Sequence, residues 1–248
     1  SFLSKFLFGS FDVSFPQNYE TKKYLNSLGA KKIKFLGNLK FSESKTQKNS
    51  ALNKNIEKIF KSRKIWCAVS THNGEEKICA EAHQKLKKKY KKLLTVIIPR
   101  HVHRVNDIYK EILDMGFKVQ IHSKKSKIKK DTDIYLVDTY GETKSFFKIC
   151  NTVFLGGSIV NHGGQNPLEP ARFGCKILHG PNIQNFTEVY GLLNKENLSF
   201  KFYNTNQLAK SVNQSLNQNI NFSKKITKLK KIGSNILNHT STEINCFL

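Results

Sequence analysis

Short apolar runs alternate with longer amphipathic stretches through most of the chain. Runs rich in β-branched and aromatic residues predict seven strands, at 65–70, 93–98, 118–122, 134–137, 153–155, 176–178 and 199–203. The stretches between them predict helices over 75–92, 104–115, 168–173 and 186–193, a short helix after Gly141, and two polar helices at the end. Continuously apolar strands separated by helices are typical of a parallel sheet that is covered on both faces.

This pattern predicts a complete, doubly wound, Rossmann-like α/β domain over residues 56–248. Residues 1–41 hold only fragments: a short helix, a strand near 12–15, a helix that ends at Gly29 and a strand at 33–36. We interpret them as the tail of an amino-terminal α/β domain whose beginning is absent, and the first residue, Ser1, fits a piece of a longer protein. The polar, lysine-rich residues 42–55 predict an interdomain linker.

Composition narrows the class of protein. No apolar run approaches the roughly 20 residues of a membrane-spanning helix. The five cysteines are scattered without CxxC spacing, which argues against a disulfide scaffold or a zinc site and fits a reducing compartment. The net charge of +24 attracts polyanions, but only four of the 42 basic residues are arginine, the residue that nucleic-acid readers favour. We therefore expect no nucleic-acid partner, and the charge gives weak support for an anionic membrane surface.

Unusual residues follow four of the predicted strands, at the edge where open parallel sheets bind ligands. The first segment, STHNGEE at 70–76, fits either an anion site or an ordinary helix cap, and capping is the better interpretation of this segment alone. The second contains Pro99 and Arg100, and an arginine there is placed to bind a phosphate, with a plain surface arginine as the alternative. The third, DTYGE at 138–142, contains Gly141, which permits a close ligand approach or makes an ordinary turn.

The fourth segment carries the strongest signal. Gly156, Gly157 and Ser158 precede HGGQNPLEP at 162–170, so two glycine pairs flank a loop that enters a helix. Glycines let backbone amides approach a phosphate, and a carboxylate in the first helical turn can bind both hydroxyls of a ribose. A loop without function would not explain both glycine pairs and the carboxylate. The histidines at 72, 101 and 103 lack a completing Asp or Cys, so we expect no metal site there.

These segments, together with GNLKF at 37–41, IIPRH at 97–101 and the run 153–190, resemble bacterial 3-deoxy-D-manno-octulosonic acid (Kdo) transferases and occur in the order of that family. The resemblance covers almost the whole chain. It implies an inverting, metal-independent glycosyltransferase with two Rossmann-like domains, the GT-B type. Such an enzyme transfers Kdo from CMP-Kdo to a lipid A precursor in lipopolysaccharide inner-core biosynthesis, at the cytoplasmic face of the inner membrane.

The resemblance also implies roles for individual residues. Lys40 matches the lysine that stabilises the transition state, and Tyr140 departs from the methionine usual at its position. The implied CMP site contains Pro99, Arg100, Tyr140, Gly141, Glu142, Asn166, Pro167, Leu168 and Glu169, to which the strand-end reasoning adds Ser70, Gly156, Gly157 and Ser158. No cofactor and no metal are expected. The general base, a glutamate, is expected with the acceptor cleft and the membrane anchor in the absent amino-terminal part, so we expect this chain alone to be peripheral, to bind CMP weakly and to transfer nothing.

Two other functions stay open at this stage. A GT-B glycosyltransferase that uses a UDP-sugar would share the glycine-rich loop and its glutamate. A non-catalytic basic module would dock on anionic lipid or nucleic acid and would bind with a steep salt dependence. The second alternative leaves all four strand-end segments unexplained.

Overall fold

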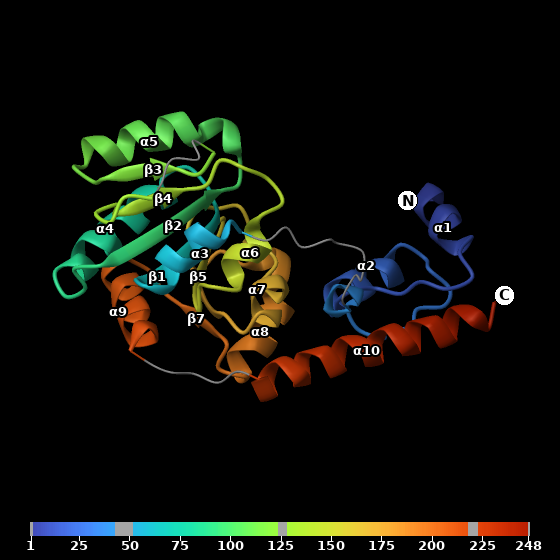
Figure 1. Cartoon of the computed structure of the whole chain (residues 1–248). Helices are drawn as coiled ribbons and strands as arrows, with labels where there is room; N and C mark the ends of the chain where they lie inside the picture. Colours follow the sequence, from blue (N-terminus) through green and yellow to red (C-terminus); the bar gives the residue numbers. More distant parts are fainter. Residues whose placement is uncertain (1, 43–51, 124–127, 218–222, 248) are drawn as a thin grey trace. The chain divides into compact units, whose positions relative to one another are not determined.

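The computed structural model describes residues 2–42, 52–123, 128–217 and 223–247 (Figure 1). The chain divides into two compact units, one formed by residues 1–47 and 224–248 and the other by residues 48–223. Each unit is described by itself. In the described ranges, no helix is both long enough and apolar enough for a membrane span.

The larger unit is built on one sheet whose strands are all parallel. The sheet order is β3-β4-β2-β1-β5-β6-β7, and each neighbouring pair runs in the same direction. The predicted parallel sheet is thereby confirmed, with strands at β1 (Lys64–Thr71), β2 (Leu93–Pro99), β3 (Val119–Ile121), β4 (Ile134–Leu136), β5 (Thr152–Leu155), β6 (Lys176–His179) and β7 (Ser199–Lys201).

The strand order reverses at the centre of the sheet. On one side of β1 lie β2, then β4, and then β3 at the edge of the sheet. After β4 the chain crosses to the other side of β1, where it adds β5, β6 and β7 in order. The carboxyl ends of β1 and β5 therefore flank the topological switch point, where open α/β sheets bind ligands. The register of β1 against β2 shifts between Val69 and Thr71, so β1 is irregular where it reaches this point.

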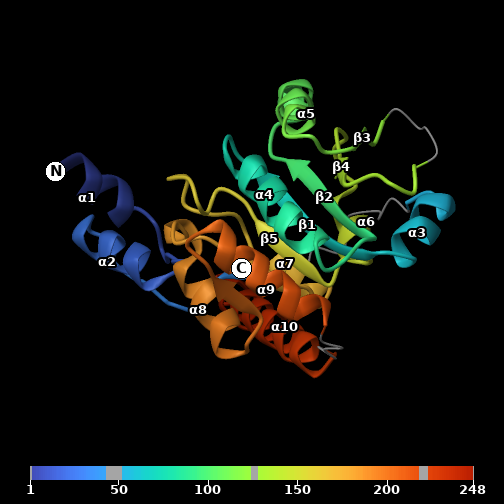
Figure 2. The same ribbon diagram turned by 90° about the vertical axis from the view of Figure 1, so that its left-hand side faces the viewer.

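Helices cover both faces of the sheet, which explains why the central strands are largely apolar. On one face lie α4 (Glu75–Lys87), α5 (Val105–Asp114) and α9 (Thr205–Leu216), and Figure 2 shows α4 and α9 side by side. On the other lie α3 (Lys54–Lys61), α6 (Thr143–Phe147) and α7 (Leu168–Arg172), while α8 (Thr187–Lys195) packs beside β7. Every residue of β2 and β5 is buried, as two covered faces require.

The smaller unit contains α1 (Phe2–Gly9), α2 (Tyr19–Ser27), a 3₁₀ turn at Leu39–Phe41 and the long α10 (Ser223–Asn245). The strands predicted near 12–15 and 33–36 form only one isolated bridge, between Ser14 and Ile33. Helix α10 packs closely here, since a Cβ atom at Gly233 would lie 2.1 Å from the carbonyl oxygen of Phe41. Residues 224–248, placed by the sequence with the larger domain, thus group with residues 1–47. Most of the predicted linker, at 43–51, lies outside the described residues.

A buried carboxylate joins elements on the β3–β4 side of the larger unit. Asp133, 4% exposed, precedes β4, and its carboxylate accepts a hydrogen bond from the Lys118 amide at 3.0 Å. It also pairs with Lys87 of α4 and lies 3.6 Å from Nε2 of His83. Burial raises the pKa of Asp133, but His83, Lys87 and the Lys118 amide together outweigh burial and hold the pKa well below its usual range.

We predict that Asp133→Asn lowers the free energy of unfolding by about 1–3 kcal/mol at pH 7, because a buried charged acceptor is lost. A depressed carboxyl pKa stabilises the fold above the unfolded value of about 4, and this contribution disappears as the pH falls through the folded pKa. Urea unfolding at pH 7 and pH 3 should therefore show a smaller difference between variant and parent at pH 3. Asp131→Asn, which removes an exposed ion pair with Lys118, serves as the control and should change stability by no more than about 0.5 kcal/mol. An equal loss at both pH values would contradict the prediction.

Candidate functional site

The predicted site residues of the larger unit follow four strands that are neighbours in the sheet, β4, β2, β1 and β5. Ser70 lies at the irregular end of β1, and Pro99 and Arg100 lie at the end of β2. Residues 140–142 follow β4, and residues 156–158 follow β5. Because these strands are parallel, all four segments lie at the same edge of the sheet, which flanks the switch point.

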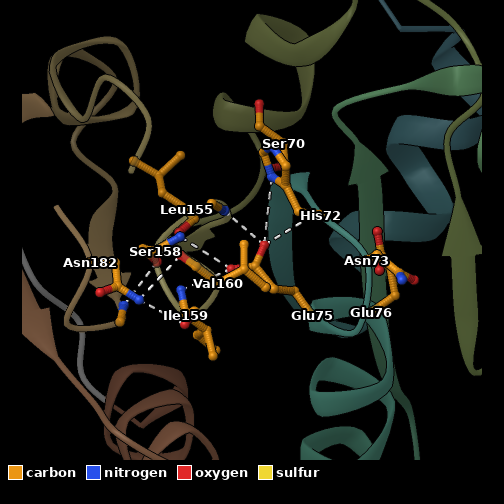
Figure 3. Close-up of polar contacts among 12 residues, drawn as sticks. Ser70, His72, Asn73, Glu75, Glu76, Leu155, Ser158, Ile159, Val160 and Asn182 are labelled. Carbon is orange, nitrogen blue, oxygen red and sulfur yellow. Dashed lines mark hydrogen bonds and ion pairs between the residues drawn. The ribbon is translucent and has the colours of Figure 1, made fainter. Parts of the chain in front are cut away.

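A fully buried carboxylate joins two of these segments. Glu75, the first residue of α4, is 0% exposed and accepts four backbone N–H groups (Figure 3). Its Oε2 atom accepts from His72 at 2.9 Å and from Gly157 at 2.8 Å. Its Oε1 atom accepts from Ser158 at 3.1 Å and from Ile159 at 3.0 Å. The loops after β1 and β5 are therefore held together by a carboxylate of the chain itself.

This arrangement corrects the interpretation of residues 70–76 as an ordinary helix cap. The N-cap of α4 is Gly74, with φ +86°, and no side chain of the described residues makes a capping hydrogen bond there. Glu75 turns instead toward His72 and the loop after β5. Ser70 also has a positive φ of 54°, which is uncommon for a residue with a side chain.

The first glycine pair has a packing role that the sequence did not indicate. A Cβ atom at Gly156 would lie 2.3 Å from the carbonyl oxygen of Ser70, so the loops after β1 and β5 approach too closely for any side chain there. The amides of Gly157 and Ser158, which we expected to face a phosphate, donate to Glu75. The structure thus gives these two amides an internal acceptor, and any ligand contact of residues 156–158 must use other atoms.

The segment after β4 presents an exposed turn. Tyr140 is 72% exposed, and Gly141 has φ +84°, with no described atom within 4 Å of the place where a Cβ would be. The Glu142 carboxylate behind them is held by Thr139 and by Nε2 of His122, at 2.9 Å. Nδ1 of His122 in turn lies 2.8 Å from the hydroxyl of Tyr135. The turn therefore leaves room for a ligand beside Gly141, and hydrogen bonds hold the neighbouring Glu142 carboxylate in place.

The first turn of α7 places the Glu169 carboxylate near α6. The Asn166 side chain accepts from the Leu168 amide at 3.0 Å, and Pro167 is the N-cap residue. Leu168 is buried and packs in the core, whereas the Glu169 side chain is 42% exposed, with Oε1 3.6 Å from Nζ of Lys144 in α6. A half-exposed carboxylate in a first helical turn can accept hydrogen bonds from ligand hydroxyls.

The remaining predicted residues differ in setting. The Arg100 side chain is exposed, while its backbone amide donates to the Thr71 carbonyl at 3.0 Å and so fixes the end of β2 against β1. Pro99 is buried. Lys40 lies in the 3₁₀ turn of the smaller unit, whereas the other predicted site residues belong to the larger unit.

Sequence reasoning included Glu75 in a segment at this edge but missed that its carboxylate joins two loops, and it did not consider Lys144. The signal for Glu75 was present, since a glutamate directly after a glycine-ended strand loop could reach a neighbouring loop as well as cap a helix. The association of Lys144 with Glu169 follows from the packing of α6 against α7, which the sequence does not show. In the described ranges, no group of three or more His, Cys, Asp or Glu residues is arranged to hold a metal ion.

We predict that Glu75→Gln lowers the free energy of unfolding by about 2–4 kcal/mol, because an amide nitrogen then faces two N–H donors whichever way the side chain is turned. Urea unfolding measures the loss. Glu81→Gln on the same helix is the matched control, since its oxygen can still accept from Thr205, and it should cost no more than about 0.5 kcal/mol. A Glu75→Gln protein as stable as the parent would show that the four amides do not depend on the charge.

Comparisons with known proteins agree with this geometry. No family model matches the chain. The chain is 32% identical to a 3-deoxy-D-manno-octulosonic acid transferase of Haemophilus influenzae over 184 residues, which are 73% of this chain and 43% of the relative. It is 29% identical to the enzyme of that name from Aquifex aeolicus over 216 residues, 87% of this chain and 57% of the relative. The chain therefore spans about half the length of the curated relatives it matches.

A solved structure shows the same fold. The C-terminal CMP-Kdo binding domain of WaaA from Acinetobacter baumannii superposes with a TM-score of 0.61 at 23% identity, over 72% of this chain and 91% of that domain. The parallel seven-stranded sheet with helices on both faces is thus the fold of the carboxy-terminal domain of GT-B glycosyltransferases, as predicted. Sequence and fold together identify the chain as similar to the carboxy-terminal part of the 3-deoxy-D-manno-octulosonic acid transferases.

Proposed function

We propose that this chain supplies the donor-binding part of a glycosyltransferase that transfers Kdo from CMP-Kdo to a lipid A precursor. One observation carries the proposal: in the larger unit, the segments that resemble the family lie at the carboxyl ends of adjacent parallel strands around the switch point. Similarity to named Kdo transferases supports the choice of donor. The acceptor, the complete reaction and its inverting course are parts of the same proposal.

The geometry suits a nucleotide donor. Arg100 presents an exposed guanidinium at the end of β2, where it can bind a phosphate oxygen. Glu169 offers a half-exposed carboxylate for the two ribose hydroxyls. The exposed turn at Tyr140 and Gly141 allows a ring to approach the backbone closely, so the change from methionine to Tyr140 need not alter that contact.

In the proposed reaction the acceptor hydroxyl attacks the anomeric carbon of Kdo, and the bond to the CMP phosphate oxygen breaks. Negative charge then develops on the departing CMP. Arg100 stabilises that charge electrostatically, so the proposed mechanism requires neither a metal nor a cofactor. The role that the resemblance implies for Lys40 stays a prediction. A general base takes the proton of the acceptor hydroxyl. We assign that role to a glutamate outside this chain.

We further propose that the protein works at the cytoplasmic face of the inner membrane. The net charge of +24 favours contact with an anionic lipid surface, which attracts basic proteins within a Debye length. A lipid A precursor is itself an anionic amphiphile, so the acceptor and the surface carry the same sign of charge. In this proposal, electrostatic attraction holds the chain at the membrane surface without a membrane-spanning segment in its described part.

We predict that the purified chain binds CMP at least about tenfold more tightly than UMP or AMP, since tenfold corresponds to about 1.4 kcal/mol, the scale of one lost hydrogen bond. Calorimetric titration measures this preference. Arg100→Ala and Glu169→Ala should each weaken CMP binding by about tenfold or more, because each removes one polar contact to the ligand. Lys110→Ala, an exposed site on α5, removes one positive charge elsewhere and is the control.

Two results would contradict the proposal and favour a different function. Equal or tighter binding of UMP would favour a UDP-sugar glycosyltransferase. Binding that lacks nucleotide preference and falls steeply with salt would favour a basic docking module.

A further inference from the structure

Histidines from three strand ends gather at the same edge of the sheet. The rings of His72 and His162 lie 4.2 Å apart between centroids, and the rings of His72 and His101 lie 6.2 Å apart. His103 extends the group, with its ring stacked on that of His101 at 5.5 Å. These residues come from the loops after β1, β2 and β5, which flank the switch point.

The backbone orients the His72 imidazole, and one of its two ring nitrogens lacks a hydrogen-bond partner among the described residues. Its Nδ1 atom lies 3.1 Å from the Ser70 carbonyl oxygen, which can only accept, so Nδ1 carries the proton. The side chain is 14% exposed, and its Nε2 atom is buried without a hydrogen-bond partner among the described residues. The hydroxyl of the adjacent Thr71 is likewise buried and unpartnered within the described ranges. Buried polar atoms that stay unpaired destabilise the fold, so a ligand that pairs with them gains affinity.

Gly157 allows the two central rings to meet. A Cβ atom at this position would lie 3.1 Å from Cε1 of His72 and 3.2 Å from Cδ2 of His162, closer than ordinary contact. His162 and His101 are exposed, so solvent and ligands reach the cluster from their side. The loop after β5 therefore combines a glycine that admits the rings with a histidine that contacts His72.

The surroundings of His72 favour its neutral form in the absence of a ligand. Burial lowers the pKa of His72, and the neighbouring His162 lowers it further. His101 also acts in this direction, while Glu75 from α4, with Oε2 3.9 Å from Nδ1, opposes it. An anion placed at the cluster would favour the protonated rings, because opposite charges stabilise each other.

We propose that His72, His101 and His162 form an oxyanion-binding subsite that takes up a proton when it binds. The protonated Nε2 atom of His72 then donates to an oxygen of the ligand, and imidazole, proton and anion become an imidazolium–anion pair. The identity of the ligand rests on the proposed function. CMP-Kdo offers two oxyanions, the phosphate of CMP and the carboxylate of the sugar, and both share this chemistry.

The first experiment needs neither a variant nor the donor. Histidine ring protons of the full chain are titrated by NMR from pH 5.5 to 8.5, with and without sulfate, whose double charge is constant over this range. We expect sulfate to raise the pKa of His72 and His162 by about 0.5 or more, and to leave the exposed His239 of the smaller unit unchanged. Equal shifts at all three residues, or none, would overturn the proposal.

The second experiment distinguishes the two oxyanions. Titration at pH 6 and pH 8 should show CMP-Kdo binding at least about threefold tighter at pH 6, and His162→Gln should abolish this difference. His162 is exposed, so the variant should fold, and His239→Gln is the matched control. A loss of affinity by His162→Gln for both CMP and CMP-Kdo, relative to the parent at the same pH, assigns the phosphate. A loss for CMP-Kdo alone assigns the sugar carboxylate.

The outcomes also separate this inference from the proposed function. Selective CMP-Kdo binding that is the same at both pH values and in His162→Gln would leave the proposed function intact and overturn the subsite. Selective pKa shifts with sulfate in a protein that does not prefer CMP would support the subsite and overturn the proposed donor.

Discussion

The Glu75 carboxylate fixes the geometry on which the candidate site depends. It accepts N–H groups from both loops that flank the switch point, and it is fully buried between them. A buried carboxylate is costly unless hydrogen bonds compensate it, and four amide donors do so here. The loop after β5 is thereby tied to the loop after β1 independently of any ligand.

This internal pairing changes how a bound donor would be recognised. In many nucleotide sites the amides of a glycine-rich loop bind the phosphate directly. Here the amides of Gly157 and Ser158 are used by Glu75. In the proposed site, the side chains of Arg100, which follows β2, and of the histidines around His72 would contact the donor instead. The glycines instead allow neighbouring segments to approach each other closely. Gly156 lets the loops after β1 and β5 touch, and Gly157 lets two imidazole rings approach.

The sequence predicted the sheet well because burial on both faces leaves strands that are apolar throughout, as in β2. It also predicted which segments meet, since parallel strands bring their carboxyl ends to one edge. It failed where a local pattern had two outcomes. The pair Glu75–Glu76 is typical of a helix start, and α4 does begin there. The role of the Glu75 carboxylate, however, depends on a long-range contact with the Gly157 amide. The grouping of α10 with residues 1–47 depends on tertiary contacts such as Gly233 with Phe41, which no local pattern encodes.

The charges at the strand ends follow from the same constraint. Because four amides satisfy Glu75, its negative charge is balanced within the fold and does not need a cation from the ligand side. Glu76 is balanced separately by Arg104, at 3.0 Å. Arg100 makes no ion pair of this kind among the described residues, and the pKa of His72 is lowered by burial. An edge at which Glu75 and Glu76 are already compensated and the Arg100 side chain is exposed suits an anionic ligand better than a cationic one. The electrostatics of the edge therefore agree with the proposed anionic donor, because the amides that compensate Glu75 remove one negative charge from the side that a ligand would meet.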